Sequence, residues 1–326
     1  MLITRTPLRI SIGGGGTDLP SYYERFGGFV ISAAIDRYIY VAINRTFTDD
    51  YFLKYSALER VKRVEDIQHP IIRESLKLHP VGPALEIVST ADIPSGTGLG
   101  SSGTFTVGLL RALYGIKREH ASAATVAEEA CRIEIDLLNR PVGKQDQYIA
   151  ALGGLTCLEF EKDGKVRASP LRIPEEAMMD LEEHLLMFFT GYSRDADAVL
   201  SEQKKASNKG DPAMLDNLHF VKELGVSIKT ALESGDCVGF GELLHQHWQH
   251  KTKRSAKVSN DRINRWYELG RQNGAIGGKL VGAGGGGFLL FYARDRLALR
   301  QAMVREGLTE VRFTFDHDGS QIIARN

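Results

Sequence analysis

The feature that most constrains the fold is a glycine- and serine-rich segment between a predicted strand and a predicted helix. Residues 94–102 read PSGTGLGSS. The preceding residues Ala84–Thr90 have the composition of a strand, and Phe105–Tyr114 has apolar residues at helical spacing. In this order, loop amides and a helix N-terminus can point toward one anion, which suits a polyphosphate. The alternative is a simple turn, because Gly and Ser are common in turns.

Two well-known glycine fingerprints do not explain this loop. No Gly-Lys-Ser/Thr follows a glycine four residues earlier, so the common P-loop is absent. Gly282, Gly284 and Gly287 match GxGxxG, but Phe288–Tyr292 after them is predicted to be a strand. A dinucleotide fold requires a helix at that point, and we therefore interpret the match as accidental.

Length and composition predict an ordinary globular protein with two lobes. The 326 residues are too many for one small core, and 43% of them are hydrophobic and 25% charged. Lys plus Arg and Asp plus Glu both total 41, so no overall field attracts nucleic acid or an anionic membrane. We expect small-molecule substrates as partners, with neither nucleic acid nor a membrane; one sequence does not define the oligomeric state.

The cysteines and the N-terminus favour a reducing compartment. Cys131, Cys157 and Cys237 are far apart and form no CxxC pair, which disfavours a disulfide framework and a zinc site. The N-terminus has no basic segment leading into an apolar stretch, and no apolar run approaches the ~20 residues of a membrane span. We expect a cytoplasmic protein.

The remaining pattern predicts a sheet-rich first half and a more helical second half. We expect a domain of residues 1–175 and a second of residues 176–326, since turn signals gather near residues 165–182. The other predicted elements are strands at Leu8–Ile12, Phe29–Asn44, Leu185–Phe189 and Val311–Phe315, helices at Ala121–Leu138, Ala196–Lys205, Leu215–Ser234 and Phe240–His250, and a loop at Gly143–Gln147.

Three motifs in a fixed order resemble those of the GHMP kinases, the superfamily of galactokinase, homoserine kinase, mevalonate kinase and phosphomevalonate kinase. The first is Arg5–Ser11 with Gly13–Asp18, the second is Pro94–Ser102, and the third is Lys279–Gly287. The resemblance spans nearly the whole chain. It implies an α+β fold of two lobes, with ATP and an acceptor in the cleft between them.

The resemblance also implies roles for individual residues. Asp146 would be the catalytic base with Arg9 beside it, and Ser102 and Glu134 would bind Mg²⁺, which prefers hard oxygen ligands. Without the resemblance, Glu134 fits a solvated helix face and Asp146 fits a turn. The residues implied for ATP binding are Pro94, Gly96, Gly98, Leu99, Gly100, Ser101, Ser102, Gly284 and Gly285.

Details of two motifs resemble the D-glycero-D-manno-heptose 7-phosphate kinase branch of the family. These are GGGGTDLP at residues 13–20 and GKQDQY at residues 143–148, where galactokinases have different residues. The implied reaction transfers the γ-phosphoryl group of ATP to the anomeric hydroxyl, forming the 1,7-bisphosphate. The residues that we expect near the acceptor are Gly15, Thr17, Asp18, Lys144 and Arg194.

A phosphorylated acceptor needs cationic groups at the far end of the cleft. We expect some of Arg5, Arg194, Lys251 and Lys253 to bind this phosphate. Two alternatives stay open: anomeric phosphorylation of a free sugar such as L-fucose, and a non-catalytic sensor of ATP and sugar. The spacing of His245, His247 and His250 fits no i,i+4 metal pair on a helix.

Overall fold

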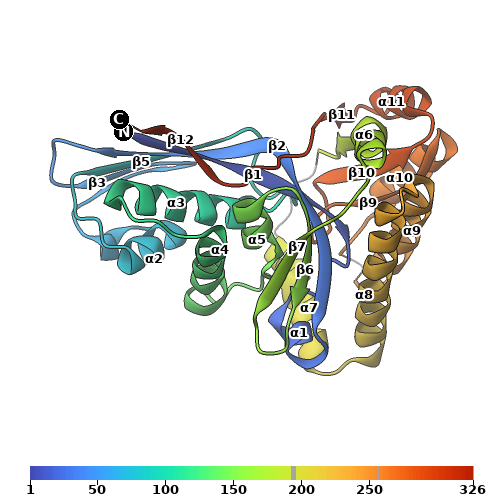
Figure 1. Cartoon of the computed structure of the whole chain (residues 1–326), viewed down its shortest axis with the longest axis horizontal. Coiled ribbons are helices and arrows are strands. Elements are labelled where there is room, and N and C mark those ends of the chain that lie inside the picture. The colour runs from blue at the N-terminus through green and yellow to red at the C-terminus, as the bar shows by residue number, and fades with distance from the viewer. Residues whose placement is uncertain (192–195, 256, 326) are drawn as a thin grey trace.

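The computed structural model describes residues 1–191, 196–255 and 257–325, and Figure 1 shows their arrangement. The strands are β1 (Leu2–Gly13), β2 (Gly28–Arg45), β3 (Tyr51–Lys54), β4 (Leu58–Val61), β5 (Leu85–Ala91), β6 (Leu155–Phe160), β7 (Val166–Pro170), β8 (Leu185–Phe189), β9 (Ala275–Leu280), β10 (Phe288–Ala293), β11 (Thr309–Glu310) and β12 (Gln321–Arg325). The helices are α1 (Pro20–Phe26), α2 (Pro70–Leu78), α3 (Ser101–Lys117), α4 (Ala123–Cys131), α5 (Gln145–Leu152), α6 (Glu175–His184), α7 (Ala196–Asn208), α8 (Pro212–Glu233), α9 (Cys237–Lys251), α10 (Asp261–Gln272) and α11 (Arg296–Arg305), with a short 3₁₀ turn at Val64–Asp66 and a π-helical turn at Arg132–Leu137.

A large sheet forms the first lobe around the long strand β2. The order of strands is β12-β1-β2-β5-β3-β4, and β6 pairs with β2 and β7. The first half of β2 pairs with β6 and the second half with β5, so two strands pair with the same edge of β2. Helices α2, α3, α4 and α5 lie along one face of this sheet (Figure 1).

The burial pattern of β2 shows how the two lobes meet. Residues 28–35 are buried without interruption, whereas Ile39–Asn44 alternates between buried and partly exposed. Continuous burial indicates cover on both faces of a sheet. Helices α3 and α5 contact β2, and α8 of the second lobe also contacts β1 and β2. The hydrophobic core is therefore continuous from one lobe to the other.

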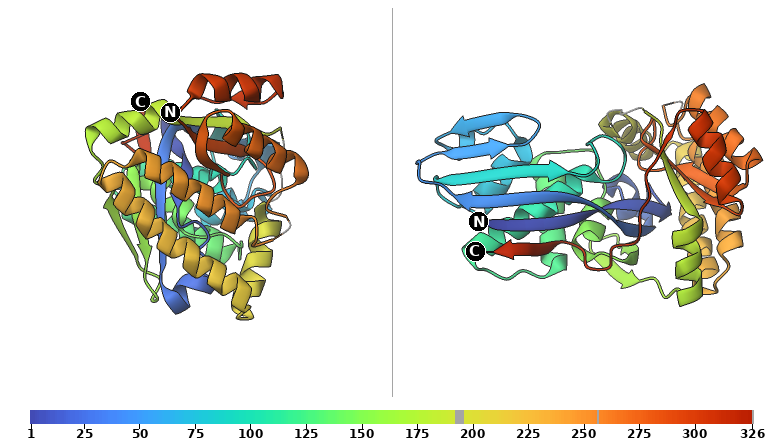
Figure 2. Two further views of the ribbon diagram at one scale, coloured as in Figure 1. Left: turned by 90° about the vertical axis from the view of Figure 1, so that its right-hand side faces the viewer. Right: turned by 90° about the horizontal axis from the view of Figure 1, so that it is seen from above.

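The second lobe contains a four-stranded antiparallel sheet in the order β11-β8-β10-β9. It is packed by α9, α10 and α6, and α8 lies beside α9 (Figure 1). The last strand, β12, then returns to the first sheet, where Leu2 is paired with Arg325. Both chain ends consequently lie together, as the view from above in Figure 2 shows. Apart from β12, the last strand of the first sheet ends at Pro170, and the second sheet begins at Leu185; a division after residue 175 stays a prediction.

Most predicted elements are confirmed, and three differ. The predicted helix Ala121–Leu138 changes to a π-helical turn after Cys131. The predicted loop Gly143–Gln147 is wrong in its second half, because α5 begins at Gln145 and includes Asp146 in its first turn. The predicted strand Val311–Phe315 is irregular apart from one bridge to Ile35, because this segment crosses from β8, where Val311 bonds to Met187, to β2, where Asp36 bonds to Thr314.

No helix among the described residues has the length and apolar character that crossing a membrane requires.

Candidate active site

A cavity of about 880 Å³ lies between the lobes. It is lined by the first glycine motif, the second glycine loop, the start of α5, the end of α9 and the start of the third motif. Ligand sites are commonly concave and of this size. The three glycine motifs, which are remote from one another in the sequence, therefore converge on one site.

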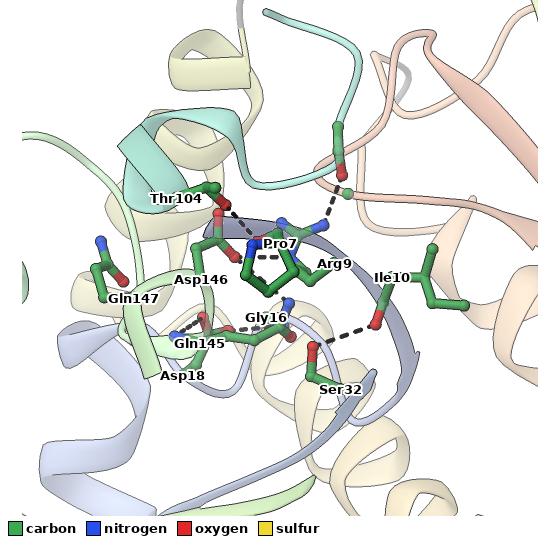
Figure 3. A network of polar contacts seen from close by, with 12 residues as sticks. Pro7, Arg9, Ile10, Gly16, Asp18, Ser32, Thr104, Gln145, Asp146 and Gln147 are labelled. Carbon is green, nitrogen blue, oxygen red and sulfur yellow. Dashed lines mark hydrogen bonds and ion pairs between the residues drawn. The ribbon is translucent and has the colours of Figure 1, made fainter. Parts of the chain in front are cut away.

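Arg9 and Asp146, which the resemblance places beside each other, form an ion pair in the structure. Arg9 on β1 is almost fully buried, and its Nε donates a hydrogen bond of 2.8 Å to Oδ1 of Asp146. Its Nη1 donates to the carbonyl of Gly98 at 2.6 Å, and its backbone N–H donates to the carbonyl of Leu99. Figure 3 shows this pair facing Gln145 and Asp18. Arg9 therefore fixes both the carboxylate and the glycine loop.

The glycine loops of the two lobes meet backbone to backbone. A Cβ atom at Gly98 would lie 2.8 Å from the carbonyl oxygen of Val281, and one at Gly282 would lie 2.6 Å from the carbonyl oxygen of Gly98. Both glycines have positive φ angles, which other residues adopt only with strain. Glycine at these positions is thus required by close approach as well as by conformation.

Asp18, in the first glycine motif, lines the cavity. Its carboxylate accepts hydrogen bonds from the backbone N–H of Gly16 at 3.1 Å and of Gln145 at 3.4 Å. Burial raises the pKa of Asp18, and the nearby charge of Asp146 raises it further. Two carboxylates from different motifs therefore share one wall of the cavity, as Figure 3 shows.

Glu134 is fully buried, so the alternative interpretation of this residue as part of a solvated helix face is wrong. The π-helical turn inserts an extra residue per turn, and Glu134 lies within this turn. The hydroxyl of Ser102 donates to Oε1 of Glu134, and Gln147 donates to Oε2 at 2.8 Å. Arg140 donates from Nη1 to both Ser102 Oγ and Glu134 Oε1. Burial raises the pKa of Glu134.

The donor set at Ser102 and Glu134 fits a divalent cation. A hydroxyl oxygen and a carboxylate oxygen are adjacent, and Mg²⁺ commonly uses one or two such ligands together with nucleotide phosphates and water. In the structure, the positive charge between these oxygens comes from the guanidinium of Arg140. Coordination of a metal by both oxygens therefore requires Arg140 to shift. No group of three His, Cys, Asp or Glu residues that could hold a metal occurs in the described part of the chain.

Four basic residues of the second lobe line the same cavity, namely His247, Lys251, Arg254 and Lys279. Lys251 donates from Nζ to the carbonyls of Leu280 and Gly282, which attaches α9 to the third motif. Lys279 contacts Nδ1 of His247 at 3.3 Å. Burial lowers the pKa of each of the four, and neighbouring cations add to the effect for His247, Lys251 and Lys279.

We predict that Lys251 makes stability increase with pH above neutrality. Burial lowers its pKa to about 7, against 10.5 for an ordinary lysine. Between these values the unfolded chain binds more protons than the folded chain, so the free energy of unfolding rises with pH by at most about 1.4 kcal/mol per pH unit from this group. Below about pH 7 the penalty of burying the ammonium is fully present.

Urea unfolding at pH 7, 8 and 9 measures this effect. In the Lys251→Met variant, the free energy of unfolding should rise less with pH than in the wild type. The Lys253→Met variant, which changes an exposed neighbour, should show the same rise as the wild type. Equal pH slopes in the wild type and Lys251→Met would show that Lys251 is not a source of this dependence.

An aromatic wall that the motifs do not include lies beside the glycine loop. Tyr55, His69 and Phe105 line the cavity, and the ring centroids are 4.7 Å apart for Tyr55 and His69 and 5.2 Å apart for His69 and Phe105. Burial lowers the pKa of His69, which favours its neutral form. Sequence spacing did not reveal this wall, because His69 and Phe105 become neighbours only when α2 packs on α3.

Most residues of the predicted ATP loop line the cavity. These are Gly96, Gly98, Gly100, Ser101 and Ser102. Pro94 and Leu99 do not line it; Leu99 is buried in the core.

The third motif lies partly outside the cavity. Its lining residues are Lys279, Gly282 and Ala283. Gly284 and Gly285 instead pack against Val258, whose carbonyl accepts a bond from the Gly285 N–H.

Some of the residues predicted to lie near the acceptor sugar line the cavity, and others do not. Gly15 and Asp18 line the cavity. Thr17 is fully buried and donates to the carbonyls of Gly14 and Phe29, so the structure places it as a support of the loop.

The ammonium of Lys144 is directed away from Asp146. It donates to the carbonyl of Gly164 and to the carboxylate of Glu128.

Four residues were proposed for a distal phosphate, and among the three of them that the structure describes, only Lys251 lines the cavity. Arg5 lies over the ring of Tyr38 and near Asp318, and Lys253 is exposed. Arg194 lies outside the described residues. Arg254 and Lys279 were not predicted to bind a phosphate, because a single cation in a loop or strand provides little signal in a sequence.

Comparison with known proteins agrees with this arrangement. The model of the GHMP kinases N terminal domain matches residues 57–154, and that of the GHMP kinases C terminal domain matches residues 228–308. The chain is 31% identical to a D-glycero-alpha-D-manno-heptose 7-phosphate kinase of Campylobacter jejuni, over 97% of each chain. It is 26% identical to an L-fucokinase/L-fucose-1-P guanylyltransferase of Bacteroides fragilis, over 94% of this chain and 36% of that protein.

A similar fold occurs in the crystal structure of a D-glycero-D-manno-heptose 1-phosphate kinase from Bacteroides thetaiotaomicron. The TM-score is 0.81 at 23% identity, and each chain is fully covered. The α+β fold of two lobes is thereby confirmed. Because both family domains are present in order and a relative above 30% identity matches from end to end, the chain belongs to the GHMP kinases and is an ATP-dependent phosphotransferase that acts on an alcohol group of a small-molecule substrate.

Proposed function

We propose that this kinase transfers the γ-phosphoryl group of ATP to the anomeric hydroxyl of D-glycero-D-manno-heptose 7-phosphate. The observation that carries the catalytic part is the Arg9–Asp146 pair, which lies between the glycine loop and Asp18 within one cavity. The similarity to a heptose 7-phosphate kinase over 97% of the chain supports the choice of sugar. Carboxylates at Asp18 and Asp146 suit an acceptor with several hydroxyl groups.

In the proposed mechanism, Asp146 orients the anomeric hydroxyl and receives its proton. A bond forms between the sugar oxygen and the γ-phosphorus, and the bond from that phosphorus to the β,γ-bridging oxygen breaks, so ADP leaves. The side chain of Asp146 is 27% exposed and faces the cavity, while Arg9 holds one of its oxygens. Positioning and charge stabilisation supply most of the rate in phosphoryl transfer.

The glycine loop would hold the nucleotide phosphates at the start of α3. Its amides and the N-terminus of a 17-residue helix favour negative charge. Tyr55, His69 and Phe105 would bind the base, since flat apolar side chains stack on aromatic rings.

Ser102 and Glu134 would hold Mg²⁺, which neutralises phosphate charge when it is bound. We predict that Glu134→Gln weakens binding of ATP in the presence of Mg²⁺ and leaves metal-free ATP binding nearly unchanged. The reason is that the amide loses the charge that attracts the cation but preserves the size of the side chain. Titration calorimetry of ATP with Mg²⁺ or with EDTA measures both affinities.

A control for this prediction is Glu128→Gln, which changes a carboxylate outside the cavity that pairs with Lys144. If Glu134→Gln weakened ATP binding equally with and without Mg²⁺, Glu134 would not be a metal ligand.

The proposed substrate is tested by comparing turnover of the heptose 7-phosphate, the unphosphorylated heptose, L-fucose and galactose. We expect the highest kcat/KM for the 7-phosphate. A preference for L-fucose would instead support the second candidate, an anomeric kinase of a free sugar, which the similarity to the Bacteroides fragilis fucokinase favours. Binding of ATP without turnover of any of these sugars would favour a sensor of the same fold.

A further inference from the structure

We propose that the guanidinium of Arg254, together with the side-chain amide of Gln203, binds the phosphoryl group already present on the acceptor. This inference rests on the proposed function, because it assigns the part of the cavity that distinguishes a sugar phosphate from a free sugar. Neither residue belongs to the three glycine motifs.

Arg254 is held in the cavity with much of its hydrogen-bonding capacity unused. It follows the end of α9, and its Nε donates to Oδ1 of Asn217 on α8 at 2.7 Å. Within the described part of the chain, Nη2 is buried without a partner and no carboxylate forms an ion pair with this guanidinium. Burial lowers the pKa of Arg254 and the negative charge of Asp18 raises it, but the buried Nη2 has no acceptor among the described residues, and a phosphate matches the paired donors of a guanidinium.

The other cations of the cavity are already engaged. Lys251 donates to two carbonyls, and Lys279 contacts His247. Arg9 is bonded to Asp146 and Gly98, and Arg140 is bonded to Ser102 and Glu134. Among the basic residues that line the cavity, Arg254 is therefore the one best able to bind a doubly charged oxyanion.

Gln203 and Arg254 converge at Gly16, in the first glycine motif. Nε2 of Gln203, on α7, donates to the carbonyl of Gly16 at 2.8 Å. A Cβ atom at Gly16 would lie 2.6 Å from Nη1 of Arg254 and 3.0 Å from Nε2 of Gln203, and φ there is +97°. Glycine thus leaves the space in which these two side chains meet the loop.

This location is on the acceptor side of the cavity. The N–H of Gly16 donates to Oδ1 of Asp18, so the same loop presents the carboxylate for hydroxyl groups and the guanidinium for a phosphate. The phosphates of ATP are expected at the other side, where the glycine loop of residues 94–102 meets Arg9. A sugar phosphate that spans the two ends would place its reacting hydroxyl near Asp146.

The test compares the wild type with Arg254→Met and Arg254→Lys for turnover of the heptose 7-phosphate and of the unphosphorylated heptose. Lys253→Met is the matched control, because it removes a positive charge from the adjacent exposed residue. We expect Arg254→Met to raise KM for the 7-phosphate roughly 10- to 100-fold, with a smaller effect of Arg254→Lys. Turnover of the unphosphorylated heptose should stay within about twofold, which also shows that the variants are folded.

The outcomes separate this inference from the proposed function. If the wild type prefers the 7-phosphate and Arg254→Met keeps that preference, the phosphate is bound elsewhere and the inference is overturned while the function stands. If Arg254→Met weakens ATP binding and acts equally on both sugars, Arg254 serves the nucleotide. A wild type without preference for the 7-phosphate overturns both proposals.

Discussion

Replacing Asp146 by Asn should lower kcat about 10²- to 10⁴-fold and change KM for both substrates little, because general-base assistance is worth a factor of this size. Asparagine retains an oxygen that can accept the bond from Nε of Arg9, which is 2.8 Å from the carboxylate in the wild type. The substitution therefore removes the charge and the capacity to take a proton and conserves the shape of the site. Steady-state kinetics with ATP and the heptose 7-phosphate measure the effect.

The control is Asp163→Asn, which removes an exposed carboxylate from the turn between β6 and β7. Its kcat should equal that of the wild type. If Asp146→Asn retained full kcat, or if it changed only KM, Asp146 would not take part in the chemical step.

Replacing Gly98 by Ala should both destabilise the protein and weaken ATP binding. Gly98 has a φ of +86°, and its added Cβ would lie 2.8 Å from the carbonyl oxygen of Val281 in the other lobe. Left-handed conformation costs an alanine about 1 kcal/mol, and a clash with backbone adds about 1–3 kcal/mol. Denaturant unfolding measures the loss, and calorimetry measures the affinity for ATP.

Gly164→Ala is a closely matched control, because φ is +87° there and nothing lies within 4 Å of the added Cβ. It should lose only the conformational part, about 1 kcal/mol, and keep the affinity for ATP. Equal losses of stability in the two variants would show that the contact between the glycine loops is not rigid.

Local patterns predicted much of the fold. The periodicity of Ala196–Lys205 and Leu215–Ser234 predicted α7 and α8, and β-branched residues predicted β1, β2, β5 and β8. These elements are long or strongly patterned, so local preference and tertiary structure agree. The strand β12 was missed, because it is short, mostly exposed and stabilised by pairing with β1 at the opposite end of the chain.

The residues of the candidate site could be predicted from the sequence where they belong to a recognisable motif. The resemblance predicted Arg9, Asp18, Ser102, Glu134 and Asp146, and the structure brings all five to one cavity or its wall. Their roles stay predictions.

The remaining contacts depend on tertiary packing. Lys144 was expected near the acceptor, yet α5 begins at Gln145, and the ammonium of Lys144 donates to the carbonyl of Gly164 instead. Arg140, Gln203 and Arg254 have no recognisable motif. Arg140 is positioned by Ser102 and Glu134 within the first lobe, whereas Gln203 and Arg254 reach Gly16 only when the lobes pack.

The most direct test of the proposed function is the phosphorus NMR spectrum of the product formed from ATP, Mg²⁺ and D-glycero-D-manno-heptose 7-phosphate. The proposed reaction predicts ADP together with a second sugar-phosphate signal that is coupled to the anomeric proton and equal in intensity to the 7-phosphate signal. Release of inorganic phosphate alone, or a new phosphate coupled to a proton at another carbon, would contradict anomeric phosphorylation.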